Sequence, residues 1–240
     1  MPNSPHRLIY YAIGDIHGEA KRLKAMYDAI VDHHSARFLG RNACIVHLGD
    51  YVDRGPDSCG VVDAVMAMEA HAAKQKDLTV VSLMGNHERM MLSGLGADPV
   101  DRRFWMQNGG VETIASYEKA GRGEADLKHL AWMKKLPLIW RDKAAGLIFV
   151  HAGVSPDDFP KESEKVYLWT RSAAFFDPSC WTSPALEGQV IIHGHTPTEN
   201  DEPDVAGGGK RINVDTGAVF GGPLTAAVLA PGEKVTFLTV

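Results

Sequence analysis

The stretch IVHLGDYVDRGP, residues 45–56, decides the fold of this 240-residue chain. An apolar run rich in β-branched residues stops at Gly49, and two Asp, an Arg, a Gly and a Pro follow directly. This pattern predicts a buried strand that ends in a charged loop, which we call the hub loop (residues 49–55). Buried strands of α/β proteins end at the sheet edge where ligands bind, so Asp50, Asp53 and Arg54 are placed for chemistry.

The same strand, loop and helix pattern occurs three times in the first half of the chain. Residues 7–13 predict a strand that ends in GDIHG (14–18), residues 42–48 end in the hub loop, and residues 78–84 end in GNHE (85–88). Apolar residues at helical spacing follow each loop. Because crossover connections share one hand, three such units predict a parallel sheet whose exit loops lie at one edge.

Residues 94–136 change to short helical patterns, and we expect them to form a helical cap beside the sheet. In the second half, residues 166–176, which contain Arg171, look helical, whereas the Gly- and Pro-rich residues 199–209 predict a mobile loop. The other segments there predict strands, at 136–141 and 146–150 (as a hairpin), 189–192, 211–214, 224–230 and 234–239.

Length and composition limit the classes of protein to consider. The chain is 45% hydrophobic, which is enough for a sizeable core, so we expect residues 1–240 to form a single domain. The formal net charge is -5 without a long run of either sign, which argues against nucleic-acid binding through bulk charge. No apolar run is long enough for a signal peptide or a bilayer span, and three cysteines without paired spacing fit a reducing compartment. We therefore expect a cytoplasmic protein without a membrane partner.

Side chains that bind metal ions follow five of the predicted strands. They are Asp15, His17, Asp50, Asn86, His87, His151 and His195. Carboxylate, amide and imidazole groups together suit Mn²⁺, Fe²⁺ or Zn²⁺ better than the all-oxygen shell of Ca²⁺ or the thiolate shell of structural zinc. A lone His or Gly-Asp at a strand end is usually structural. Seven such residues at equivalent points of successive units predict a metal site.

These motifs, in this order, resemble the signature of the phosphoprotein-phosphatase branch of the metallophosphoesterases. The matching motifs are GDIHG (14–18), GDYVDRG (49–55), GNHE (85–88), HAG (151–153) and GHT (194–196). Three further motifs are similar to the small bacterial and phage lambda type protein phosphatases, namely WMQNGG (105–110), LWTR (168–171) and DTGAVF (215–220). The resemblance spans residues 14–217 and implies a layered α/β sandwich with a dimetal site at the carboxyl-terminal edges of the strands.

The resemblance also implies roles for the metal-type residues. Asp15 and His17 are expected to bind one divalent ion and Asp50 to bridge two. The ligands of the second ion are expected to be Asn86, His151 and His195. A shared carboxylate holds two cations roughly 3.5 to 4 Å apart, and a water between them loses its proton near neutral pH, which makes a metal-bridging hydroxide the implied nucleophile. We expect Mn²⁺, with Fe²⁺ and Zn²⁺ as alternatives.

Three side chains are expected to act on the substrate, and a fourth to orient one of them. By resemblance, Arg54 and Arg171 bind the phosphoryl oxygens, since a planar guanidinium suits two oxygens of one phosphate. His87 is the expected general acid, with Asp53 holding its ring and raising its pKa.

The resemblance predicts a metal-dependent phosphatase, first of all one that acts on phosphoserine or phosphothreonine in proteins. The alternative is a hydrolase of dinucleoside polyphosphates such as diadenosine tetraphosphate, which uses the same dimetal core. Glu88 in GNHE resembles the phosphatases, because those hydrolases often carry Asp there. An inactive binding module of the same fold is a third hypothesis, although the ligand set shows no erosion. The substrate is thus a phosphoprotein or a phosphorylated small molecule, and the sequence leaves the oligomeric state open.

Overall fold

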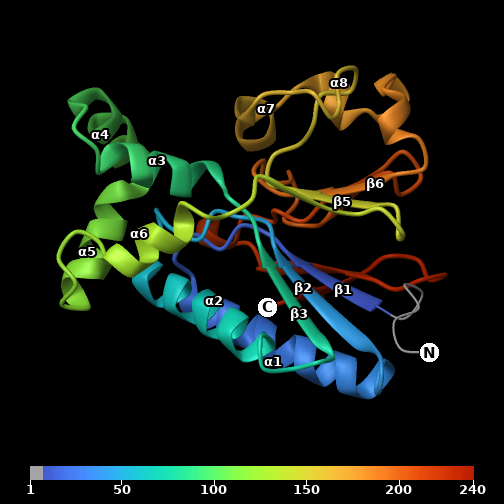
Figure 1. The fold of residues 1–240 in the computed structure, drawn as a ribbon, viewed down its shortest axis with the longest axis horizontal. Helices are drawn as coiled ribbons and strands as arrows, with labels where there is room; N and C mark the ends of the chain where they lie inside the picture. The colour runs from blue at the N-terminus through green and yellow to red at the C-terminus, as the bar shows by residue number, and fades with distance from the viewer. Residues whose placement is uncertain (1–7) are drawn as a thin grey trace.

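A computed structural model describes residues 8–240, which form two β-sheets packed face to face, with helices on the outer face of each (Figure 1). The predicted first strand included Arg7, which lies outside the described residues. In the first sheet, β1 (Leu8–Ile13), β2 (Asn42–His47) and β3 (Leu78–Ser82) are parallel, as predicted. The closing strands β9 (Thr225–Leu229) and β10 (Thr236–Thr239) extend this sheet antiparallel to β1, in the order β10-β9-β1-β2-β3.

The second sheet is built from the strands of the second half of the chain. It has the order β4-β5-β6-β8-β7, and its strands are β4 (Ile139–Asp142), β5 (Leu147–Val150), β6 (Val190–His193), β7 (Asp204–Ala206) and β8 (Arg211–Asn213). The predicted hairpin is confirmed, since β4 and β5 pair antiparallel. The prediction of a mobile loop at 199–209 was wrong in part, because β7 lies within it and pairs with β8.

Alternating side chains of β1 show how the layers are packed. Tyr11 and Ile13 belong to the core that α1 (Ala20–Arg37) and α2 (Ser58–Ala72) cover, whereas Tyr10 and Ala12 pack between the two sheets against Phe149. The second sheet buries its other face under α7 (Glu164–Trp169) and α8 (Ala173–Phe176). Burial on both faces explains why the strand sequences are almost continuously apolar.

All regular elements described between residues 86 and 136 are helices, and they lie beside one end of the two sheets (Figure 1). They are α3 (Asn86–Gly94), α4 (Pro99–Trp105), η2 (Met106–Gly110), α5 (Val111–Lys119) and α6 (Leu127–Met133). Gly109 in η2 has a φ of 108°, and a Cβ there would lie 2.5 Å from the backbone nitrogen of Arg54. Glycine therefore lets this helical segment approach the hub loop closely.

The helix predicted at 166–176 is broken. α7 ends at Trp169, Thr170 is extended with a ψ of 134°, and α8 begins only at Ala173. Arg171 lies in this break and is exposed, so the prediction of a continuous helix was wrong. Three short 3-10 helices complete the described elements: η3 (Pro178–Cys180), η4 (Pro184–Leu186) and η5 (Ala218–Phe220).

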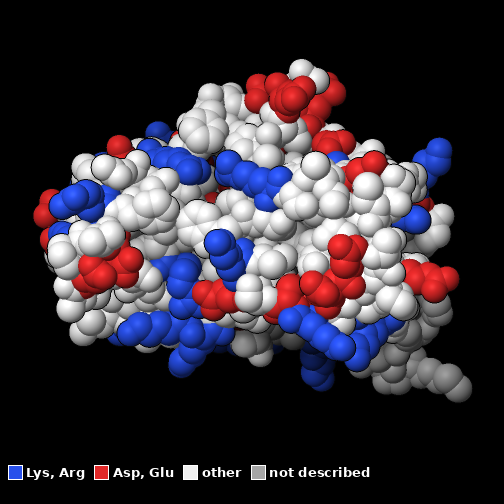
Figure 2. Space-filling view, turned by 90° about the horizontal axis from the view of Figure 1, so that it is seen from above, with Lys and Arg blue, Asp and Glu red and all other residues white. Residues whose placement is uncertain are grey.

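Two surface properties bear on the expected partners. On the face shown in Figure 2, patches of Lys and Arg and patches of Asp and Glu are both present among the described residues, so neither sign of charge covers this face. Among residues 8–240, no helix has the length and apolar character that crossing a bilayer requires.

Candidate metal centre

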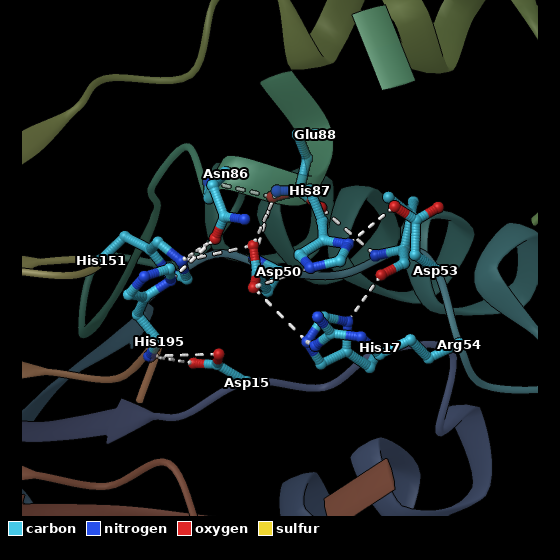
Figure 3. Close-up of polar contacts among 12 residues, drawn as sticks. Asp15, His17, Asp50, Asp53, Arg54, Asn86, His87, Glu88, His151 and His195 are labelled. Carbon is cyan, nitrogen blue, oxygen red and sulfur yellow. Dashed lines mark hydrogen bonds and ion pairs between the residues drawn. The ribbon is translucent and has the colours of Figure 1, made fainter. Parts of the chain in front are cut away.

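The predicted metal-type residues meet at one place, beyond the carboxyl-terminal ends of strands from both sheets. Figure 3 shows Asp50 in the middle, with His17 on one side and His151 and His195 on the other. The six predicted ligands are all at most 6% exposed: Asp15, His17, Asp50, Asn86, His151 and His195. They follow β1, β2, β3, β5 and β6, with Asn86 as the first residue of α3, so the structure brings together all the strand ends that the sequence singled out.

One half of the centre is formed by His17, Asp50 and His87, which offer ligand atoms within 4.8 Å of one another. His17 Nε2 lies 3.4 Å from Asp50 Oδ2. His17 Nδ1 donates to the carbonyl oxygen of Val52 at 2.8 Å, which places the ring proton on Nδ1. His17 Nε2 therefore carries a lone pair, and this atom lies beside both Asp50 Oδ2 and the Arg54 guanidinium.

The other half is formed by Asp50, His151 and His195, again within 4.8 Å. His151 Nε2 lies 3.4 Å from Asp50 Oδ1 and 2.8 Å from Asn86 Oδ1. His195 Nδ1 approaches the same amide oxygen at 2.9 Å. The two halves thus share Asp50, one carboxylate oxygen facing each side.

The chemistry of these groups fits a cation. His151 Nδ1 donates to the carbonyl oxygen of Leu48 at 3.0 Å, and burial lowers the pKa of this ring to about 3, so its Nε2 carries a lone pair. That lone pair faces another acceptor, Asn86 Oδ1, with no hydrogen between them. Burial also raises the pKa of Asp50 well above its usual range, because the charge is removed from water. Buried acceptors directed at one another are stabilised by a divalent cation between them.

Asp15 and Asp215 lie beside the centre rather than in either three-residue group. Both carboxylate oxygens of Asp15 accept from the backbone N–H of His195 at 3.1 Å. Burial and the neighbouring Asp215 and Asp50 raise the pKa of Asp15. Asp215, which follows β8, was not among the predicted site residues, although its DTG motif at a strand end was a signal for it. It is 4% exposed, and burial raises its pKa to about 6.

Glu88 was not predicted as a site residue, and it holds the hub loop in place through hydrogen bonds to its backbone. Its side chain is fully buried, and its two carboxylate oxygens accept four backbone N–H groups. The donors are Asp50 (2.9 Å), Tyr51 (2.7 Å), Val52 (3.2 Å) and Gly85 (2.9 Å). The last of these contacts is a capping-box bond at the start of α3. Burial raises the pKa of Glu88 to about 7, although the four N–H groups oppose this shift.

Replacing Glu88 by Gln should destabilise the protein by about 3 kcal/mol or more, because either amide orientation directs an NH₂ at two buried N–H donors. Urea denaturation of metal-free protein measures the loss. Glu118→Gln is the matched control, since Glu118 is exposed on α5. A loss below about 1 kcal/mol for Glu88→Gln would show that the hub loop does not depend on these contacts.

His87 and Asp53 form a buried pair. His87 Nδ1 lies 2.7 Å from Asp53 Oδ2, and Asp53 Oδ1 accepts from Trp105 Nε1 at 2.9 Å and Thr113 Oγ1 at 2.7 Å. The expectation that Asp53 raises the pKa of His87 was wrong. Burial, then the positive charge of Arg54, lower that pKa well below its usual value. Trp105 and Thr113 were missed, because only the fold shows that the helical segment reaches Asp53.

The two predicted arginines lie at opposite sides of the centre. Arg54 Nη1 is 2.8 Å from His17 Nε2, and the Arg54 backbone N–H donates to Gly109. Arg171 Nε donates to His195 Nε2 at 3.3 Å. Each guanidinium thus contacts a predicted ligand, and its remaining N–H groups can donate to the oxygens of a phosphate.

This chain is similar to a known protein family, to named relatives and to solved structures. The family model for calcineurin-like phosphoesterases matches residues 10–222. A protein of Anoxybacillus flavithermus named Bis(5'-nucleosyl)-tetraphosphatase PrpE [asymmetrical] is 30% identical, with 95% of this chain and 94% of the relative covered. A protein of the same name from Halalkalibacterium halodurans is 28% identical, with 89% and 87% covered. The structure of a cold-active protein-tyrosine phosphatase from a Shewanella species has a TM-score of 0.66 at 19% identity, covering 100% of this chain and 82% of that one. These matches confirm the predicted metallophosphoesterase-type sandwich.

Proposed function

This chain belongs to the calcineurin-like phosphoesterase family, and on that premise we propose that it hydrolyses dinucleoside polyphosphates, with diadenosine tetraphosphate as the representative substrate. The observation that carries the proposal is its similarity, over nearly its whole length, to proteins named as asymmetrical bis(5'-nucleosyl)-tetraphosphatases. The order of the two hypotheses from the sequence is therefore reversed. The likeness to a solved phosphatase at 19% identity supports the fold alone.

We assign the predicted ligands to two divalent ions, with Mn²⁺ expected and Fe²⁺ or Zn²⁺ as alternatives. Asp15 and His17 would hold one ion, and Asp50 would be shared. Asn86, His151 and His195 would hold the other. When bound, such ions neutralise phosphate charge and activate a water for attack on phosphorus.

The remaining side chains have roles that follow from their positions. Arg54 and Arg171 bind phosphoryl oxygens at the two sides of the centre and stabilise the negative charge that develops there. Asp53 fixes the orientation of the His87 ring through Nδ1, so that Nε2 points toward Asp50 and the reacting phosphate. The negative charge of a bound phosphate favours the protonated form of His87, which then donates its Nε2 proton to the leaving oxygen.

Replacing Arg171 by Ala should raise KM for the dinucleotide by about tenfold or more, with a smaller change in kcat, because a charge-assisted contact to phosphate is lost. Inhibition by inorganic phosphate should weaken in parallel. The control is Arg37→Ala, which removes an exposed arginine at the end of α1 that pairs with Glu233. Unchanged KM and phosphate inhibition in the Arg171 variant would exclude its role in binding.

The function is tested by a substrate comparison on metal-reconstituted protein. We expect kcat/KM for diadenosine tetraphosphate to exceed that for a phosphoserine peptide by about tenfold or more. Chromatography should show unequal products, a nucleoside monophosphate and a nucleoside triphosphate. Preference for the peptide would instead support the protein phosphatase. A preparation with no bound metal and no hydrolysis of a simple aryl phosphate after Mn²⁺ addition would support the binding module.

A further inference from the structure

Two aromatic side chains at the rim of the metal centre are unusual in this molecule. The chain has eight Phe, five Trp and six Tyr, all of which lie within residues 8–240. Among these described residues, only Phe104, at 48%, and Phe220, at 66%, are exposed. Aromatic rings contribute large apolar areas and are mostly buried, so two exposed rings beside one site favour a ligand-binding role.

Phe220 lies on the Arg54 side of the centre. Its ring centre is 5.6 Å from Arg54 Cζ, and Nη1 of the same guanidinium is 2.8 Å from His17 Nε2. Phe220 ends the short helix η5, and left-handed glycines at 217 and 221 flank this helix. This tight turn directs the ring outward, one guanidinium away from the predicted ligand His17.

Phe104 lies on the His195 side of the centre, paired with Trp169. The two ring centres are 6.2 Å apart, and the Trp169 ring is also 6.2 Å from that of His195, nearly perpendicular to it. Trp169 immediately precedes the break that carries Arg171. Figure 3 shows Arg54 and His195 on opposite sides of Asp50, so the Phe104–Trp169 pair and Phe220 flank the centre.

We propose that Phe220 and the Phe104–Trp169 pair are stacking surfaces for the two bases of a dinucleoside polyphosphate. This inference rests on the proposed function and deepens it. Such a substrate carries a planar base at each end of an anionic chain. From one side of the site to the other lie Phe220, Arg54, the metal centre, Arg171 and the Phe104–Trp169 pair. This series matches a base, a chain of phosphates and a second base. Bases stack on aromatic rings with little regard to their identity, so the site should accept guanine as well as adenine.

The test compares a ligand that carries two adenosines with one that consists of the phosphate chain alone. KM for diadenosine tetraphosphate and the inhibition constant of inorganic tetraphosphate are measured for the wild type, Phe220→Ala and Phe104→Ala. Each Ala variant should raise KM by about five- to 100-fold, as expected for loss of one base stack, and change the inhibition constant by less than about twofold. Calorimetry with a methylene-bridged, non-hydrolysable analogue should show the same loss of affinity.

Two controls separate stacking from general damage. Phe220→Trp keeps an aromatic surface and should retain a KM near that of the wild type. Leu39→Ala removes an apolar side chain that is 84% exposed after α1 and should change neither constant. The inference is overturned if the wild type hydrolyses the dinucleotide and Phe220→Ala leaves KM within about twofold of it. Failure of the wild type to hydrolyse the dinucleotide, with turnover of the phosphopeptide, would refute the proposed function itself.

Discussion

Asp50→Asn should lower kcat for the dinucleotide by about 100- to 1,000-fold, the range seen when one preorganised electrostatic group is removed from an active site. The substitution keeps the shape of the side chain and still allows one oxygen to accept the His87 backbone N–H, a contact of 3.0 Å in the structure. It removes the negative charge that faces both His17 and His151. Elemental analysis should therefore show loss of metal together with loss of turnover.

The stability of the same variant separates a metal role from a folding role. Burial and the Glu88 charge raise the pKa of Asp50, so the ionised carboxylate is unfavourable in the metal-free protein. In chelator, Asp50→Asn should be at least as stable as the wild type, and added Mn²⁺ should raise the Tm of the wild type only. Asp28→Asn, which alters an exposed carboxylate on α1, is the control. Near-normal activity and metal content in Asp50→Asn would contradict the assignment of Asp50 as the shared ligand.

The sequence allowed the centre to be predicted because its residues follow strands. Each strand has a strong apolar pattern, and the parallel arrangement brings the residues after β1, β2 and β3 to one edge. The convergence of Asp15, Asp50 and Asn86 needed no further information, whereas their expected roles as ligands came from the family resemblance. His151 and His195 come from the second sheet, and their proximity to Asp50 depended on the family resemblance rather than on the residue pattern.

The residues that were missed act through tertiary contacts. Glu88 accepts hydrogen bonds from backbone N–H groups of the hub loop. Trp105 and Thr113 donate hydrogen bonds to Asp53, which lies more than fifty positions away in the chain. No local periodicity encodes such contacts. The break at Arg171 was missed for a similar reason, because the apolar spacing of 166–176 is helical although Thr170 is extended.

The choice between phosphatase and dinucleotide hydrolase could not be made from Glu88. Its carboxylate is fully buried, and both oxygens are occupied by backbone N–H groups, so it has no means of contacting a substrate. The substrate contacts that we propose come instead from exposed side chains, such as Arg171 and Phe220. These positions have no periodic pattern, because the core does not constrain them.

His87→Asn should lower kcat by about 100-fold or more for a phosphate ester with a poor leaving group, such as an alkyl ester. For a nitrophenyl ester the loss should stay within about tenfold, because that leaving oxygen needs little protonation. The physical basis is the geometry of the ring. Nδ1 is held by Asp53 at 2.7 Å, which leaves Nε2, 4.0 Å from Asp50 Oδ2, to face the reacting group.

Metal content decides between two roles for this histidine, since His87 also lies within ligand distance of His17 and Asp50. If His87 is the general acid, His87→Asn keeps both ions and loses rate selectively for poor leaving groups. If His87 is a ligand, one ion is lost and both esters slow equally. His71→Asn, an exposed histidine in the last turn of α2, is the control and should alter neither property. We expect the first outcome, because His87 Nε2 lies 4.0 Å from the Asp50 carboxylate, farther than His17 Nε2 and His151 Nε2, which lie 3.4 Å from it.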